Sequence, residues 1–294
     1  METAIKETEP FEEELGLRVS WLEVFRRKGT AILGALLLLL TIFIAVFAPH
    51  LTHYKPLRLD VSVRLQGPSA SHLFGTDEFG RDVFSRVLFG TRVSLLVGGA
   101  VMLFTSLVGV ILGILAGYYD FLDNILMRIM DGLMAFPAMV MAIALMAVLG
   151  PSVLNVIIAL SFIYMPRTAR IIRSVVLVVR EMVYVQAARA LGARDLRITL
   201  KHVLPNCIPP LIVQSTFIFA YSVLAEASLS FLGVGVPPDI PSWGNIISSG
   251  RLFIREAPWM SIFPGVAILI TCMALNLLGD GLRDALDPRM REIA

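Results

Sequence analysis

The chain has 294 residues, of which 56% are hydrophobic and only 16% are charged, and its mean hydropathy is +0.78. Soluble domains carry about 25% charged residues, so this composition excludes an ordinary soluble protein and favours one that lies in a lipid bilayer. The net charge of +2 and the isoelectric point of about 8.6 are too mild for a protein that binds nucleic acid.

Residues 1–29 are predicted to form a cytoplasmic tail and an interfacial segment. The first 19 residues are acidic and polar and offer too little apolar surface to fold alone. Apolar residues at 21–25 then stand beside a basic cluster at 26–28, a combination typical of a segment that lies on the membrane surface. A cleaved signal peptide would have a shorter apolar part behind a short basic start, so we expect a retained anchor.

Long apolar runs predict six membrane-spanning helices, because a helix needs about 20 apolar residues to cross a bilayer. The sequence has no Asp, Glu, Lys or Arg over 31–48, 93–119 and 257–279, nor over 132–166, where Gly150 and Pro151 interrupt the run. The predicted fold is therefore an all-α integral membrane protein. Its six expected transmembrane helices cover residues 30–49, 93–117, 124–149, 152–171, 207–231 and 258–280.

These spans divide the chain into five parts. The tail precedes a first transmembrane helix at 30–49, and an external loop at 50–92 separates this helix from a five-helix core at 93–281. The core contains a cytoplasmic loop over 174–206, and residues 282–294 form the C-terminus. An even number of spans places both termini on one side. That side carries 17 of the 25 Lys and Arg residues, so the positive-inside rule puts both termini in the cytoplasm.

Small and soft residues in the spans are interpreted as packing elements. Gly109, Gly113 and Gly117 fall four apart, so a helix stacks them on one face and lets a neighbouring helix approach closely. Cys207 and Cys272 lie in or beside apolar stretches without metal-ligand spacing, and they are expected to fill gaps rather than form a disulfide. We therefore expect no metal site.

Three polar or helix-breaking features of the spans have both a structural and a functional interpretation. Phe136-Pro137 in the third span and Pro166 near the end of the fourth predict kinks, which either shape a transmembrane pathway or only improve packing. Glu226 is the one ionisable residue in the fifth apolar stretch, close to a helix end expected at 230–233. A structural carboxylate bonded to loop amides is favoured over a substrate or proton site.

The cytoplasmic segment from Tyr184 to Asn206 is the most informative part of the sequence. Its first half is a short Ala- and Leu-rich helix that should end at Gly192, a residue able to take the left-handed conformation. Asp195 favours the start of a second short helix, and Pro205 marks the return to the membrane. Physics alone leaves two possibilities open: a helix that docks into a groove of a soluble partner, or a solvated loop.

The spacing in this segment resembles the loop signature of the integral-membrane subunits of bacterial ATP-binding-cassette (ABC) importers. That signature is Glu-Ala-Ala, three residues, Gly, nine residues, Ile, any residue and Leu-Pro. The matching positions here are Gln186, Ala187, Ala188, Gly192, His202, Leu204 and Pro205. Gln186 replaces the acidic residue and His202 the aliphatic one, so a role for a negative charge at the first position does not carry over.

Further segments extend the resemblance from about residue 20 to 291. They are residues 72–86, residues 226–233, Trp243-Gly244 and residues 279–288. Together they resemble the second of the two permeases in the dipeptide, oligopeptide and nickel branch of these importers.

This resemblance implies the type I ABC importer fold and a multi-pass location in a bacterial or archaeal cytoplasmic membrane. It implies a homologous permease partner, two cytoplasmic ATP-binding subunits and an external substrate-binding protein. It also implies that the segment around Gln186 to Pro205, Asp195 included, couples this chain to the ATPases.

No Gly-x-x-x-x-Gly-Lys-Ser/Thr phosphate loop is present. We therefore expect no enzyme activity and no cofactor in this chain, with ATP and Mg²⁺ bound by the partner ATPase subunits. The cargo is expected to be a short peptide, with nickel chelates or glutathione-like compounds as the alternative.

The external loop at 50–92 is long for a simple connection. Its turns contain Asp77, Arg81 and Asp82, which are candidates for contact with the binding protein. A lid or a structural cap, in which the Asp and Arg residues only satisfy each other, is the alternative.

Two other function classes are less well supported by the sequence. An intramembrane hydrolase needs a base beside a serine, but all four histidines fall outside the six expected spans. A self-contained secondary transporter often shows internal repeats, and none is evident here.

Overall fold

The computed structural model describes residues 29–286, so the expectations for the tail before residue 29 and for residues 287–294 lie outside the described part. Within that part the regular secondary structure is entirely helical, and the one β-type contact is an isolated bridge between Thr76 and Asp82. The long helices are α2 (Gly29–Leu51), α3 (Val83–Tyr118), α4 (Asp120–Met134), α5 (Ala138–Leu149), α6 (Val153–Val179), α9 (Leu204–Phe231) and α11 (Trp259–Leu286).

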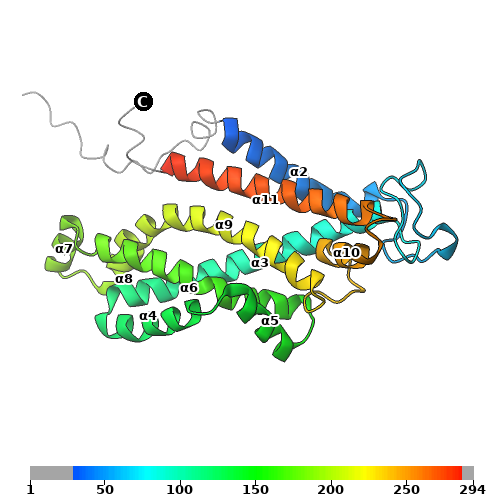
Figure 1. Cartoon of the computed structure of the whole chain (residues 1–294). Coiled ribbons are helices and arrows are strands. Elements are labelled where there is room, and N and C mark those ends of the chain that lie inside the picture. Colours follow the sequence, from blue (N-terminus) through cyan, green and yellow to red (C-terminus); the bar gives the residue numbers. More distant parts are fainter. Residues whose placement is uncertain (1–28, 287–294) are drawn as a thin grey trace, which may run out of the picture.

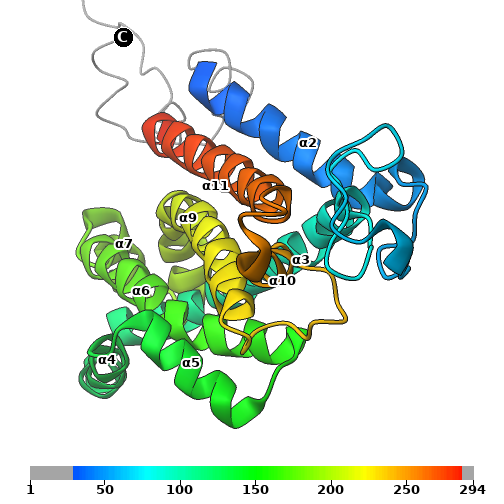
Figure 2. The same cartoon turned by 45° about the vertical axis from the view of Figure 1, so that its right-hand side comes forward.

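The helices form an elongated bundle with distinct ends (Figure 1). One end carries the short helices α7 (Val183–Ala190) and α8 (Asp195–Ile198), and the other carries the 52–82 loop and α10 (Trp243–Gly250). The start of α2 and the finish of α11 both lie toward the end that carries α7. Figure 2 shows α2 and α11 as a pair beside the central helices α3, α6 and α9, with α4 and α5 at the opposite edge.

The glycines at four-residue spacing bring α3 and α6 into close contact, as the sequence predicted. A Cβ atom added to Gly113 would lie 2.6 Å from the Ala169 carbonyl oxygen, and one added to Gly117 would lie 2.6 Å from Val176 Cβ. Both distances are far below van der Waals contact. The backbones of α3 and α6 therefore approach at a distance that only glycine permits.

The span expected at 124–149 is divided by a sharp bend at Pro137. The chain forms two helices there, α4 and α5, whose axes differ by 91° across a short break. Pro137 has no N–H to continue the α4 hydrogen bonds, and it adopts extended backbone (ψ 127°) directly before α5. The kink that Pro137 predicted is thus a sharp turn between two separate helices.

Four helical stretches of the described chain are long and apolar enough to cross a membrane, and the bent α4–α5 pair would make a fifth. The four are Gly29–Leu51, Val83–Tyr118, Asp195–Phe231 and Trp259–Leu286. The span expected at 152–171 lies in α6 and is not among these four. The second half of α6 carries three arginines, Arg167, Arg170 and Arg173, which make it less apolar. The structure therefore supports an all-α membrane fold, whereas the predicted count of six spans is not established by helix length and composition.

At the end opposite α7, Trp243 and Gly244 of α10 pack closely on α3 and α9. Trp243 is buried and its Nε1 donates to the Val87 carbonyl of α3 at 3.1 Å. Gly244 packs so closely on α9 that an added Cβ would lie 2.4 Å from the Ala227 carbonyl oxygen. Trp259 Nε1 donates to the Thr76 carbonyl at 3.0 Å, which ties α11 to the 52–82 loop.

Candidate functional site

The segment between α6 and α9 folds as a helical hairpin, defined here as residues 183–203. Its first helix, α7, stops at Gly192, which has a φ of +81°. The Gly192 amide donates to the Arg189 carbonyl and the Ala193 amide to the Ala188 carbonyl, the paired hydrogen bonds of a Schellman motif. The predicted left-handed glycine is therefore confirmed.

The second half of the hairpin is continuous with α9, contrary to the expectation of a separate short helix. Residues 195–231 form one helical stretch in which Thr199–Val203 is wound as a π-helix. The Leu204 amide bonds to the Thr199 carbonyl five residues earlier, directly before Pro205, which lacks an amide N–H. The wider turn accommodates the proline without ending the helix, so a displacement of the hairpin passes directly into α9.

An apolar core attaches the hairpin to the bundle. Val185 of α7, Ile198 of α8 and Val203 of the π-helix are fully buried, and they join one cluster with Ile172 and Val176 of α6. Cys207 is a free, buried member of the same cluster, as its packing interpretation predicted. Burial of several aliphatic side chains makes this contact firm, since each contributes about 1.5–3 kcal/mol.

A polar clamp adds a third attachment, to the end of α3. The Tyr118 hydroxyl donates to Asp195 Oδ1 at 2.7 Å and accepts from Arg189 Nη2 at 3.2 Å. This second bond raises the pKa of the Arg189 guanidinium. Tyr118 thus joins both helices of the hairpin, and no feature of the sequence around it indicated this role.

The outer surface of the hairpin exposes large apolar side chains. Leu191 is 89% exposed, Val183 is 83% exposed and Leu196 is 70% exposed. Ala187 is also exposed, and the Gln186 side-chain amide donates to the Glu181 carbonyl at 3.3 Å and to the Glu181 carboxylate at 3.5 Å. The matched signature residues therefore divide into an outward group on α7 and an inward group, His202, Leu204 and Pro205, at the junction with α9.

Glu226 is fully buried and bonded to serine hydroxyls, not directly to loop amides as the sequence suggested. Its Oε2 accepts from Ser94 Oγ of α3 and its Oε1 from Ser230 Oγ of α9, both at 2.9 Å. The Ser230 hydroxyl in turn accepts from the Val236 amide at 3.0 Å. Ser230 therefore links the carboxylate to the loop after α9. This supports a structural role for Glu226, but its direct partners are serine hydroxyls and not loop amides.

The three candidate contact residues of the external loop are buried in ion pairs. Asp77 accepts from Arg81 Nε at 2.6 Å and also pairs with Arg86, while Asp82 caps α3 and bonds His72 Nδ1 at 3.0 Å. These side chains satisfy one another inside the loop. This arrangement favours the structural-cap alternative for Asp77, Arg81 and Asp82 over direct contact with a partner.

The two proline features differ in their surroundings. Phe136 is exposed at the break between α4 and α5, next to Pro137. Pro166 is buried inside a continuous α6 and makes no break there.

Sequence comparison assigns the family. Residues 109–292 match the family described as binding-protein-dependent transport system inner membrane component. The chain belongs to this family. Residues 18–68 also match the N-terminal transmembrane domain of oligopeptide transport permease C.

Relatives in this family are similar to the chain over nearly its whole length. A putative peptide transport system permease protein of Brucella suis is 52% identical over 268 residues, which cover 91% of this chain and 90% of the relative. A dipeptide transport system permease protein of Alkalihalophilus pseudofirmus is 44% identical (92% and 90% covered). A glutathione transport system permease protein of Pectobacterium atrosepticum is 41% identical (98% and 97% covered).

These matches confirm the resemblance to the second permease of the peptide-importer branch and the type I ABC importer fold class. Members of the family are permease components of transport systems, so the chain is a multi-pass membrane component that works with other subunits.

Proposed function

We propose that this chain is one of two permease subunits of an ABC importer that carries short peptides across the cytoplasmic membrane. With a homologous permease it forms the translocation pathway, and it receives cargo from an external binding protein. Two cytoplasmic ATPase subunits bind ATP and Mg²⁺ and supply the energy. The chain itself is a transport subunit without catalytic activity, consistent with the absence of a phosphate-loop sequence.

The observation that carries this proposal is the exposed apolar surface of a firmly attached hairpin. Leu191, Val183 and Leu196 extend from an end of the bundle that also bears many basic residues, so lipid tails do not cover them. An exposed apolar patch on such an element marks a protein contact. Because the hairpin continues into α9 and is clamped to α3 and α6, a partner that moves it moves three helices.

The proposed orientation places both termini and the hairpin in the cytoplasm. The loop at 50–92, which is external in this orientation, carries six Lys and Arg residues, more than the positive-inside rule favours. Two of these, Arg81 and Arg86, are buried in pairs with Asp77, so they stabilise the loop and contribute little free charge for topology. The helix ends agree, because α2 starts and α11 finishes toward the end of the bundle that carries α7 (Figure 1).

Peptides are proposed as the cargo because relatives named for peptide and dipeptide transport reach 52% and 44% identity. A glutathione permease at 41% identity keeps a glutathione-like tripeptide as the second candidate, and a nickel chelate is the remaining one. Glutathione is itself a peptide with free carboxylates, so these two candidates share their chemistry.

Substitution of Gly192 tests the coupling role. Valine at a φ of +81° is strongly disfavoured, whereas asparagine tolerates this conformation, and neither meets a neighbouring atom there. We expect Gly192→Val to reduce peptide uptake and ATPase stimulation by loaded binding protein about tenfold or more, and Gly192→Asn to keep most of both. The measurement uses the complete complex, reconstituted in proteoliposomes, with subunit stoichiometry checked by gel filtration.

Wild-type activity for Gly192→Val in both assays would contradict the coupling role of the hairpin. Peptide uptake by the purified chain alone, without ATPase subunits, would instead favour a self-contained transporter.

A further inference from the structure

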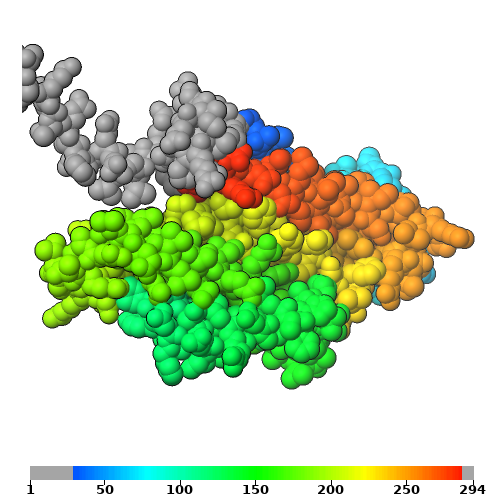
Figure 3. Space-filling model, turned by 60° about the vertical axis from the view of Figure 1, so that its left-hand side comes forward, coloured from blue at the N-terminus to red at the C-terminus, as the bar shows by residue number. Residues whose placement is uncertain are grey.

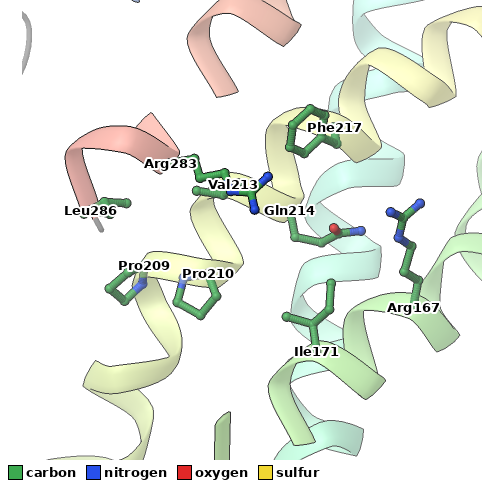
Figure 4. A pocket seen from close by; sticks show the side chains of 9 residues that line it. All are labelled: Arg167, Ile171, Pro209, Pro210, Val213, Gln214, Phe217, Arg283 and Leu286. Atoms are coloured by element: carbon green, nitrogen blue, oxygen red, sulfur yellow. The ribbon is translucent and has the colours of Figure 1, made fainter. Parts of the chain in front are cut away.

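A cavity of about 450 Å³ opens between α6, α9 and α11. Figure 4 shows side chains from all three helices that line it, and Figure 3 shows the surface of α9 between α11 and the region of α6 and α7. Its volume lies within the range of about 300–1,000 Å³ that is typical of small-molecule sites. It is separate from the hairpin surface, and no site residue discussed above lines it.

Gln214 of α9 is the central polar group of this cavity. It is only 7% exposed, yet its side-chain amide makes no hydrogen bond within the described residues. Figure 4 shows the amide extending into the cavity, on the side of Arg167. An amide offers both a donor and an acceptor, and among the described lining residues only Gln214 supplies one to a group in the cavity.

Two guanidinium groups face the same space from opposite walls. Arg167 extends from α6 and Arg283 from α11 toward Gln214 (Figure 4). Neither forms an ion pair with another described residue, and no carboxylate is among the described residues that line the cavity.

The other arginines of α6 show that this lack of a partner is particular to Arg167. Arg170 pairs with Asp131 and Arg173 with Asp123, both on α4. Arg167 lies one turn before Arg170 on α6 and has no acidic partner among the described residues. Its charge is therefore available to a ligand.

The remaining walls are apolar, with Pro210 and Phe217 of α9 and Ile171 of α6. Both arginine side chains are exposed at the cavity, so a charged ligand reaches them without crossing an apolar layer. Two guanidinium groups and an amide donor suit a carboxylate, which accepts paired hydrogen bonds from arginine.

We propose that this cavity binds a carboxylate group of the transported molecule as it passes along α9. The inference rests on the proposed function, because it treats the α6–α9–α11 face as part of the pathway. The cavity lies beside the first turns of α9 after the hairpin, on the release side in the proposed orientation. A phosphate of an anionic lipid shares the same chemistry and is the competing occupant.

The test compares two peptides that differ only at the C-terminus, one with a free carboxylate and one with an amide. Their binding to the purified complete complex, without the binding protein, is measured by titration calorimetry in nanodiscs of zwitterionic lipid. We expect the free acid to bind more tightly than the amide. Arg167→Gln or Gln214→Leu should weaken free-acid binding about tenfold and leave amide binding unchanged.

Arg170→Gln is the matched control, since it removes one positive charge from the same helix on the face that pairs with α4. It should keep the preference for the free acid. An equal affinity of the wild-type complex for both peptides, or an undiminished preference in Arg167→Gln, would overturn the inference. A preference that disappears when anionic lipid is added would assign the cavity to a lipid headgroup and overturn it as well.

Uptake in proteoliposomes separates this inference from the proposed function. If the wild-type complex takes up peptide but the arginine variant keeps its free-acid preference, only the cavity assignment fails. If the wild-type complex takes up no peptide with loaded binding protein and ATP, the proposed function itself fails.

Discussion

Glu226 joins α3, α9 and the following loop through Ser94 and Ser230. A buried carboxylate in an apolar bundle is costly unless its oxygens are satisfied, and both oxygens here accept a hydroxyl proton. The sequence identified the residue because it is the single ionisable group of its apolar stretch. It could not identify Ser94, which lies 132 positions away and becomes a neighbour only when α3 packs on α9.

Substitution of Glu226 distinguishes a structural carboxylate from a proton or substrate site. Glutamine keeps an acceptor oxygen for one serine and fits the same space, so Glu226→Gln should lower stability by about 1–2 kcal/mol and retain uptake. Glu226→Leu leaves both serine hydroxyls unpaired and should cost about 2–4 kcal/mol. Thermal unfolding of the purified complex measures both. Loss of uptake in a Gln variant of undiminished stability would instead indicate that the charge itself functions in transport.

At the scale of elements, the sequence predicted the contact between α3 and α6 more accurately than it predicted where helices begin and end. The glycines of α3 predicted its close contact with α6, because their spacing is set by helix geometry alone. The break between α4 and α5 was missed because residues 132–149 are uniformly apolar, and a proline in a span either kinks or breaks a helix. Which of the two occurs depends on how the flanking helices pack in the folded bundle, where α4 lies against α6 through ion pairs such as Arg173–Asp123.

The contact of α3 with α6 predicts opposite outcomes for two glycine substitutions. Gly113→Ala would place a Cβ 2.6 Å from a backbone oxygen of α6 and should destabilise the bundle by about 1–3 kcal/mol. Gly132→Ala is the control, because Gly132 also lies in a helix, α4, and an added Cβ meets no atom within 4 Å. It should be neutral or slightly stabilising. Equal melting temperatures for the two variants in detergent would contradict the close contact.

The external loop offers a second test at this scale. Asp77 is fully buried between Arg81 and Arg86, so Asp77→Asn leaves two buried guanidinium groups with weaker partners and should destabilise the loop by about 3–5 kcal/mol. Asp60→Asn changes a carboxylate at the loop surface whose hydrogen bonds go to Ser62, and it should leave the loop as protected as in the wild type. Protease protection of the loop in inverted and right-side-out vesicles reports the difference. Wild-type protection in Asp77→Asn would argue against the structural cap.

At the scale of the whole molecule, the sequence motif indicated the family and with it a set of partners. The fold indicates the route by which a movement of the hairpin would reach the central bundle. The hairpin continues into α9 through one helical stretch at residues 195–231. The continuity of residues 195–231 was not predicted, since Pro205 usually signals a helix boundary and the π-helix before it has no clear sequence signature. The cavity at Arg167 was also beyond prediction, because it depends on how α6, α9 and α11 pack around it.

The central claim is that the hairpin is seated in an ATPase subunit of the assembled complex. A photoreactive benzophenone residue introduced at Leu191 tests it directly, with the same residue at Val61 of the external loop, 76% exposed, as the control. In the active complex we expect an ATPase adduct from position 191 and none from position 61. Absence of any ATPase adduct from position 191, in a complex that still hydrolyses ATP and takes up peptide, would contradict the account.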